Sequence, residues 1–326
     1  MVENTLPVSG KLVFVIGDVM LDRYIYGEVN RTSPEAPVPV LEISRTSESA
    51  GGAANVALNM NGLNIDTLLI SMIGNDESAQ ELILFLNKTG LSTDGLLRSS
   101  NRKTTEKIRL MSGDQHLLRM DNEDIHPLSK DDERSLWNHI QYLFNIQKPD
   151  VIVLQDYNKG VLTPFLITSV LSLAKKWTIP VAVDPKDNHF WAYRDVSIFK
   201  PNRREIQKKI PFVFENNVSD LKKVTDYIFS KLQCNIAVIT LGENGVWLAN
   251  QSSGIWIKGV KQEIIDVCGA GDAVIASLVW ALLNGYDLEN MGKFANAAGL
   301  QACCCPGVTP LVWNTFWPFY LNLYTK

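Results

Sequence analysis

The chain has 326 residues, 46% of them hydrophobic, and a formal net charge of −4. This length supplies enough apolar side chains for the core of one large domain or two modest ones. The negative charge argues against a nucleic-acid partner and against a membrane surface, since both attract basic proteins. No signal-peptide pattern opens the chain, and the longest apolar helical run, 273–283, is too short to cross a bilayer. A cytoplasmic protein is expected.

Five cysteines are present, of which Cys303, Cys304 and Cys305 are contiguous and Cys234 and Cys268 stand alone. No C-x-x-C pair occurs and the four histidines lie far from the cysteines in sequence, so a zinc site is not expected. An odd number of cysteines without a secretion signal favours reduced thiols. We interpret them as small buried residues.

Short apolar or β-branched runs alternate with longer amphipathic stretches along most of the chain. The short runs predict buried parallel strands at 12–16, 67–73, 151–154, 181–183 and 237–240. The longer stretches predict helices at 52–61, 78–89, 131–145, 164–176, 219–231 and 288–299. This alternation predicts an α/β sheet covered by helices on both faces.

Two regions interrupt the alternation, 22–45 and 103–121. The first has prolines and alternating polarity without a helical period, and the second alternates like a hairpin around Ser112-Gly113-Asp114. Both predict strands of a small separate sheet that is attached to the main domain as a lid. No internal repeat or low-complexity linker is present, so residues 1–326 are predicted to form a single domain with this lid.

Residues 264–283 carry the strongest functional signal. A β-branched segment predicts a strand that runs into the turn Gly269-Ala270-Gly271, followed by Asp272 and an apolar helix. Backbone N–H groups in such a turn point inward, and the positive end of the helix dipole lies behind them, which suits a transferring phosphoryl group. Asp272 is then placed to accept the proton of an attacking hydroxyl. The alternative is an ordinary helix start capped by Asp272, and this segment alone does not decide between the two.

Four motifs in one order resemble the ribokinase-like (PfkB) sugar kinase family over residues 11–309. They are Gly51–Ala57 (GGAANVA), Lys200–Glu205 (KPNRRE), Thr240–Gly245 (TLGENG) and Asp266–Ala276 (DVCGAGDAVIA). The resemblance implies a three-layer αβα sandwich with a small β-sheet lid. It also implies an enzyme that uses ATP and Mg²⁺ to phosphorylate a sugar, and a homodimer formed through the β lid is expected.

Three further segments resemble more narrowly the kinases of bacterial lipopolysaccharide heptose synthesis. They are residues 17–42, 155–164 and 183–202. Those enzymes phosphorylate D-glycero-D-manno-heptose 7-phosphate at the C1 hydroxyl, and this chain would correspond to the kinase portion of a longer enzyme. Two alternatives remain open. One is a sugar kinase with a ribose- or fructose-like substrate, and the other is a catalytically idle sugar-phosphate-binding protein of the same fold.

Several residues are predicted to contact the sugar. Gly51 and Gly52 let a sugar approach the backbone, and Asn55 one turn later can hydrogen-bond its hydroxyls. Asp18 and Asp22 follow the first strand, where open α/β sheets bind ligands. The far phosphate of a heptose 7-phosphate requires cations, and Arg119 and Lys186 are predicted to lie at that end, away from Asp272.

The resemblance also assigns nucleotide-side residues. Asn202 and Glu205 match residues that bind the nucleotide phosphates in the family. The residue that Glu205 matches also binds Mg²⁺ through a water molecule. Gly242 and Asn296 match further nucleotide positions, with Asn296 on the adenine side.

Three features depart from the family pattern. Cys268 stands where threonine is usual, Gln155 and Asn158 replace small residues, and the segment 303–310 (CCCPGVTP) replaces a G-K-x-G-T loop.

Overall fold

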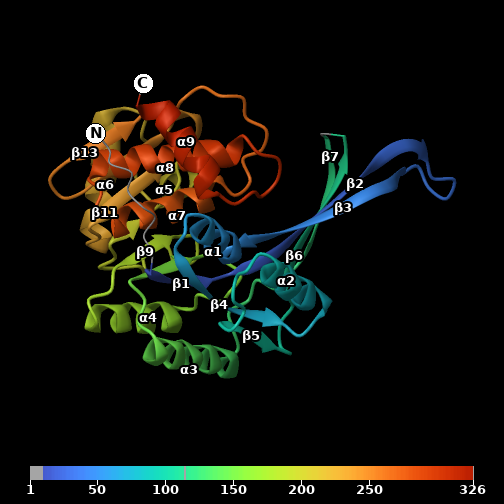
Figure 1. Cartoon of the computed structure of the whole chain (residues 1–326), viewed down its shortest axis with the longest axis horizontal. Helices are drawn as coiled ribbons and strands as arrows, with labels where there is room; N and C mark the ends of the chain where they lie inside the picture. Colours follow the sequence, from blue (N-terminus) through green and yellow to red (C-terminus); the bar gives the residue numbers. More distant parts are fainter. Residues whose placement is uncertain (1–9, 114, 326) are drawn as a thin grey trace.

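The structure, a computed structural model, describes residues 10–113 and 115–325, and the strands within them form two sheets (Figure 1). The large sheet contains β1 (Leu12–Gly17), β4 (Asp66–Gly74), β5 (Leu96–Ser99), β8 (Val151–Gln155), β9 (Val181–Asp184), β10 (Ile198–Phe199), β11 (Ile236–Thr240), β12 (Val246–Ala249) and β13 (Gly254–Ile257). Their order is β13-β12-β11-β10-β9-β8-β1-β4-β5. The strands from β11 to β5 are parallel, and the β12–β13 hairpin is antiparallel.

Helices cover both faces of this sheet. One face packs against α1 (Ala53–Gly62), α2 (Glu77–Lys88), α7 (Ala270–Leu283), α8 (Leu288–Cys303) and α9 (Trp313–Tyr324). The other face packs against α3 (Lys130–Ile146), α4 (Pro164–Lys176), α5 (Arg203–Gln207) and α6 (Val218–Leu232). Strand β1 contributes Val13 and Val15 to the first core and Phe14 and Ile16 to the second, as alternation along a strand requires. The predicted three-layer αβα sandwich is confirmed.

The small sheet extends away from the main body (Figure 1). It contains β2 (Val19–Thr32), β3 (Pro39–Gly52), β6 (Thr105–Ser112) and β7 (Gln115–Asn122) in the order β3-β2-β6-β7. Its base is tied to the main body by Arg23 of β2, which pairs with Glu81 of α2 as well as with Glu106 of β6 and Glu48 of β3. The predicted lid sheet is present at both predicted regions, whereas the single-domain organisation stays a prediction.

The predicted strand before the glycine turn is wrong. Residues 258–269 form neither a strand nor a helix, and Ile264, Ile265 and Val267 are exposed at 50%, 61% and 70%. The sheet ends at β13 on this side, and the backbone N–H groups of Ile265 and Asp266 donate to the carbonyl oxygen of Cys303 instead of to a strand. The helix prediction holds, because α7 begins at Ala270 directly after the turn.

The cysteines are less buried than the sequence suggested. Cys234 is buried, but Cys268 and the triplet 303–305 are only half-buried, because they lie in and beside the irregular segment just described. In the part of the chain that the structure covers, no helix has the length and apolar character needed to cross a membrane.

Candidate active site

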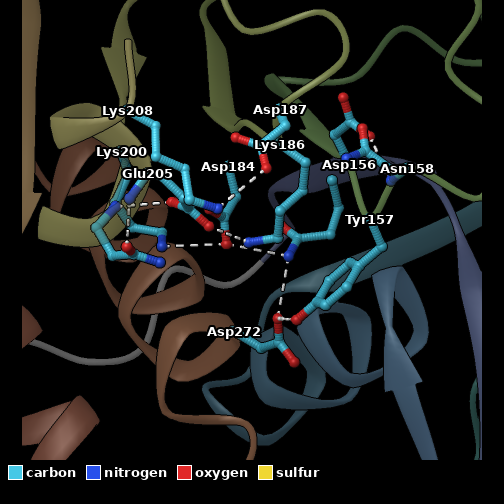
Figure 2. Close-up of polar contacts among 12 residues, drawn as sticks. Asp156, Tyr157, Asn158, Asp184, Lys186, Asp187, Lys200, Glu205, Lys208 and Asp272 are labelled. Atoms are coloured by element: carbon cyan, nitrogen blue, oxygen red, sulfur yellow. Dashed lines mark hydrogen bonds and ion pairs between the residues drawn. The ribbon is translucent and has the colours of Figure 1, made fainter. Parts of the chain in front are cut away.

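The carboxyl group of Asp272 lies at one end of a cluster of polar side chains, next to Tyr157 (Figure 2). Asp272 is in the first turn of α7 and is 2% exposed. Its Oδ1 accepts hydrogen bonds from Gln155 Nε2 at 3.0 Å and from the Tyr157 hydroxyl at 2.8 Å. Its Oδ2 accepts one from Asn55 Nδ2 at 2.8 Å. Groups from α1, β8 and the loop after β8 therefore hold this carboxylate in one orientation.

The surroundings of Asp272 change its acidity. Its pKa is raised to about 6: burial and the charge of Asp184 raise it, and the hydrogen bond from Asn55 lowers it. Burial and the nearby Asp272 charge also raise the pKa of Tyr157 well above its usual value, so its hydroxyl stays a donor. A carboxylate with a pKa close to neutral pH is suited to act as a general base.

The glycine turn lies beside a buried lysine. Gly269 has a φ of 77°, a left-handed conformation that favours glycine, and it directly precedes α7. A side chain at Gly271 would meet only Lys200 Nζ at 3.7 Å and Asp184 Oδ2 at 3.9 Å. Lys200 is 2% exposed and pairs with Asp184 Oδ2 at 3.0 Å. The helix start, with residues 269–271, and this ammonium group together form a candidate anion hole.

The predicted nucleotide residues Asn202 and Glu205 contact each other at the start of α5. Asn202 Oδ1 accepts from the Glu205 backbone N–H at 2.9 Å, and Glu205 Oε2 accepts from the Asn202 backbone N–H at 2.8 Å. This capping box gives both side chains a structural role. The remaining oxygen, Oε1 of Glu205, accepts from Lys186 Nζ at 2.5 Å.

The predicted position of Lys186, at the end of the pocket away from Asp272, is wrong. Lys186 pairs with Glu205, and its Nζ lies 5.1 Å from the ring centroid of Tyr157, whose hydroxyl contacts Asp272. Burial lowers its pKa, but the carboxylates of Asp184, Glu205 and Asp272 outweigh this effect and raise it. The sequence placed Lys186 correctly after β9 but could not show that the loop turns toward α5.

Asp18 and Asn55 have protein partners where sugar hydroxyls were expected. The Asp18 carboxylate is 1% exposed and accepts from the backbone N–H groups of Tyr157, Lys159 and Val161 at 2.8–3.0 Å. It therefore holds the loop that carries Tyr157. Asn55 donates to Asp272, and its Oδ1 accepts from Asn59 at 3.0 Å. Both residues support the site from within the protein.

Asp22, Gly51 and Gly52 meet where the lid joins the main body. Asp22 forms an ion pair with Arg109 of β6, and both side chains are buried. A side chain at Gly51 would collide with the Asp22 carboxylate, and one at Gly52 would collide with the Asp18 carbonyl. Gly52 also has a φ of 63°, so the chain needs glycine to turn from β3 into α1. The predicted group is thus brought together, with Arg109 as an added member.

Three predicted residues make no described contact with the Asp272 cluster. Arg119 lies on β7 directly opposite Arg109, is largely exposed and pairs with Asp121 at 2.9 Å. Asn296 Nδ2 donates to the Lys258 carbonyl at 3.0 Å and to the Tyr324 hydroxyl at 2.8 Å. Gly242 follows β11 with a φ of 61° and has open space beside it.

Sequence reasoning missed the roles of Gln155, Tyr157 and Lys200. Gln155 ends β8, Tyr157 lies two residues later, and Lys200 directly follows β10. The rule that singled out Asp18 and Asp22, polar residues at the carboxyl ends of parallel strands, would have found all three.

Comparisons with known proteins agree with this geometry. The bifunctional protein HldE of Wolinella succinogenes is 37% identical over 286 residues, which cover 88% of this chain and 60% of that protein. The chain therefore spans about 60% of the length of such curated relatives. The structure is similar to Escherichia coli phosphofructokinase-2 in complex with substrates and products, with a TM-score of 0.81, 18% identity, and coverage of 96% and 99% of the two chains. Arabidopsis thaliana ribokinase complexed with ribose and ATP gives a TM-score of 0.72 at 18% identity, with the same coverage.

These structural likenesses show that the fold is ribokinase-like. The family model described as pfkB family carbohydrate kinase matches residues 11–314, which is most of the chain. A glycine turn at the start of α7, followed directly by a buried aspartate, agrees with phosphoryl transfer to a sugar. The chain belongs to the pfkB family of carbohydrate kinases.

Proposed function

We propose that this protein uses ATP to phosphorylate the C1 hydroxyl of D-glycero-D-manno-heptose 7-phosphate. The product would be the 1,7-bisphosphate, a precursor of ADP-heptose and of the lipopolysaccharide core. The kinase activity rests above all on the buried Asp272 carboxylate beside the glycine turn and Lys200. The choice of sugar rests on the heptose-kinase-like segments and on the relatives at 37% identity. Because the reaction consumes ATP, we place it in the cytoplasm.

The chemistry follows from the positions of these groups. Asp272 accepts the proton of the C1 hydroxyl as its oxygen attacks the γ-phosphorus of ATP. The bond from that phosphorus to the β-phosphate oxygen breaks, and ADP leaves. The backbone N–H groups at 269–271 and the Lys200 ammonium stabilise the negative charge on the phosphoryl group during transfer.

Mg²⁺ fits the nucleotide side only through water. Both oxygens of Glu205 already accept hydrogen bonds, one from Lys186 and one from the Asn202 backbone. No cluster of three or more metal-ligating side chains exists in the described ranges, and magnesium commonly keeps several of its waters. Glu205 would hold a magnesium-bound water, and the ion would neutralise charge on the ATP phosphates.

Since Lys186 lies beside Glu205, we assign recognition of the sugar phosphate to the lid. Strand registers place Arg109 opposite Arg119, and both share a face of the lid with Asp22. Arg45 lies on the same face, 4.0 Å from the ring centroid of Tyr26. Guanidinium groups bind phosphate in a bidentate manner, so a face with three of them suits a sugar phosphate.

The deciding experiment compares kcat/KM for heptose 7-phosphate and for the dephosphorylated heptose. The wild type should prefer the phosphorylated sugar. Replacing the exposed Arg119 in Arg119→Met should reduce that preference about tenfold, which is the scale of one charged hydrogen bond, and should leave the KM for ATP unchanged. If the wild type prefers the neutral sugar, or a ribose- or fructose-like sugar, the heptose 7-phosphate assignment is wrong. The protein would then be a sugar kinase with another substrate. Turnover of no sugar in a panel would favour the idle binding protein.

We also propose a homodimer formed through the lid. The face opposite the arginines carries Ile25, Ile108 and Leu110, together with Leu118 and Met120, which are 55% and 41% exposed. An exposed apolar face on a projecting sheet is typical of an interface.

A further inference from the structure

Gln155 occupies the middle of the large sheet. It is the last residue of β8, is fully buried, and pairs with Gly17 of β1 on one side and with Asp184 of β9 on the other. Two parallel strands therefore hold its backbone in place. Its side chain emerges at the carboxyl edge of the sheet, where α7 begins.

The amide nitrogen of Gln155 bridges two carboxylates. Nε2 donates to Asp272 Oδ1 at 3.0 Å and to Asp184 Oδ2 at 3.1 Å, which uses both of its hydrogens. The reversed amide would place its oxygen against two negatively charged groups, so this orientation is the only favourable one. Oε1 is left buried without a hydrogen-bond partner among the described residues.

A buried acceptor without a partner reduces stability, so its presence requires an explanation. Both carboxylates also have partners other than Gln155. Asp272 also accepts from Asn55 and Tyr157, and Asp184 pairs with Lys200. A glutamine at this position therefore makes the folded protein less stable than an apolar residue of the same size would. Local losses of stability of this kind are a feature of functional sites.

The bridge also selects the atom of Asp272 that accepts the proton. Oδ1 already accepts two hydrogen bonds, from Gln155 and Tyr157, whereas Oδ2 accepts a single one within residues 10–113 and 115–325, from Asn55. A carboxylate oxygen has two lone pairs, so Oδ2 keeps one free.

We propose that Gln155 is a positioning residue for phosphoryl transfer, because its amide fixes Asp272 relative to Asp184 and Lys200 and leaves Oδ2 as the proton acceptor. The amide connects α7, which carries the base, to the sheet, which carries Lys200 beside the glycine turn. This inference rests on the proposed role of Asp272 as general base. Displacing a reacting group by about 1 Å can cost on the order of 10²-fold in rate, so such a connection has a measurable effect.

The main test uses Gln155→Met, which keeps the length of the side chain and removes the bridge. We expect kcat to fall by about 10–100-fold, with the KM for ATP and for the sugar within about threefold of wild type. The melting temperature should not fall, because the unpartnered Oε1 is removed as well. Gln301→Met is the matched control, since Gln301 also has a buried Oε1 without a partner and, among the described residues, makes no hydrogen bond to Asp272, so its kcat should stay at the wild-type value.

A double-mutant cycle separates this inference from the proposed function. In an Asp272→Asn background, adding Gln155→Met should lower kcat no further, because the bridge then has no base to position. A further loss by the same factor, or a Gln155→Met variant with kcat near wild type, would overturn the inference. An Asp272→Asn variant that keeps wild-type turnover would instead overturn the base assignment itself.

Gln155→Glu provides a second variant if the methionine protein does not fold. Glutamate keeps the size, but it has at most one hydrogen to donate, so it cannot serve both carboxylates. Its kcat should fall at least as far as that of Gln155→Met. A folded Gln155→Glu protein with wild-type kcat would refute the bridging role.

Discussion

The centre of the main domain and the lid hold their polar side chains in different ways. At the centre, Asp272, Gln155 and Lys200 are at most 2% exposed and contact partners from several elements. On the lid, every residue of β7 is exposed, and Arg119 pairs with Asp121 two positions along the same strand. The buried side chains at the centre are therefore held in one conformation, whereas the exposed side chains of β7 can adopt several.

This difference matches two requirements of a sugar kinase. Phosphoryl transfer depends on fixed donors and a fixed base, which a buried network provides without reorganisation. Recognition of one sugar among many depends on a surface that can contact it and release it. The base of the lid is joined to the main domain through α2, where Glu81 pairs with Arg23 of β2 and the Ser78 hydroxyl donates to Glu106 of β6.

The largest expected effect tests the centre. Asp272→Asn should lower kcat by about 10²–10⁴-fold with substrate affinities largely intact, because asparagine keeps the size but cannot accept the hydroxyl proton. Since burial raises the pKa of Asp272 to about 6 in the free protein and the base must be ionised, wild-type kcat/KM for the sugar should be constant above that pH and fall about tenfold per pH unit below it. Stopped-time measurement of ADP formation across pH 4.5–8 (about the range in which such groups titrate) records both effects.

The residual activity of the same variant provides the control. Without the carboxylate, the fall below pH 6 should disappear from the Asp272→Asn profile. A folded Asp272→Asn protein with near wild-type turnover would show that another residue is the general base. The same conclusion would follow if the activity of this variant still fell below pH 6.

Most of the fold could be predicted from the sequence, because strands buried on both faces form continuous apolar runs. Five runs predicted β1, β4, β8, β9 and β11 within a few residues. Strands β5, β10, β12 and β13 were missed. They are four, two, four and four residues long, and runs this short carry little periodic signal. The segment before Gly269 was misread because β-branched residues do not by themselves make a strand.

The site could be predicted as a set of residues but not as a set of contacts. A glycine turn before an apolar helix and an acidic residue just after a strand are local patterns, and so Asp18, Asp272 and the glycine turn were predicted. The partner of a side chain is not local, since Gln155 and Asp272 are 117 positions apart and Asp18 and Val161 are 143 apart. For the same reason, the direction taken by Lys186 was predicted wrongly.

The position of Lys186 gives the next prediction. Lys186→Met should raise the KM for ATP by about 10–100-fold, the scale of a charged hydrogen bond, and change the KM for the sugar by less than about threefold. Lys208→Met is the matched control, because Lys208 is exposed and its Nζ pairs with Asp187 at 3.4 Å, with no other ion pair in the described part of the chain. Steady-state kinetics with each substrate varied in turn decide the matter. If Lys186→Met raised the KM for the sugar phosphate and left the KM for ATP unchanged, Lys186 would bind the sugar phosphate. Phosphate recognition would then lie at the centre as well as on the lid.

The smallest expected effect on turnover comes from the apolar face of the lid. Leu118→Glu places a charge among Ile25, Ile108 and Leu110 and should convert a dimer to a monomer, because a buried unpaired carboxylate is costly. Sedimentation or light scattering measures the mass, and kcat should change by less than about threefold, since this face points away from the arginines. Val213→Glu is the control, because Val213 is 81% exposed on the main domain. An unchanged mass would exclude this face as the interface. A monomer with turnover reduced more than tenfold would mean that the partner subunit completes the site, so that the lid takes part in catalysis as directly as the centre does.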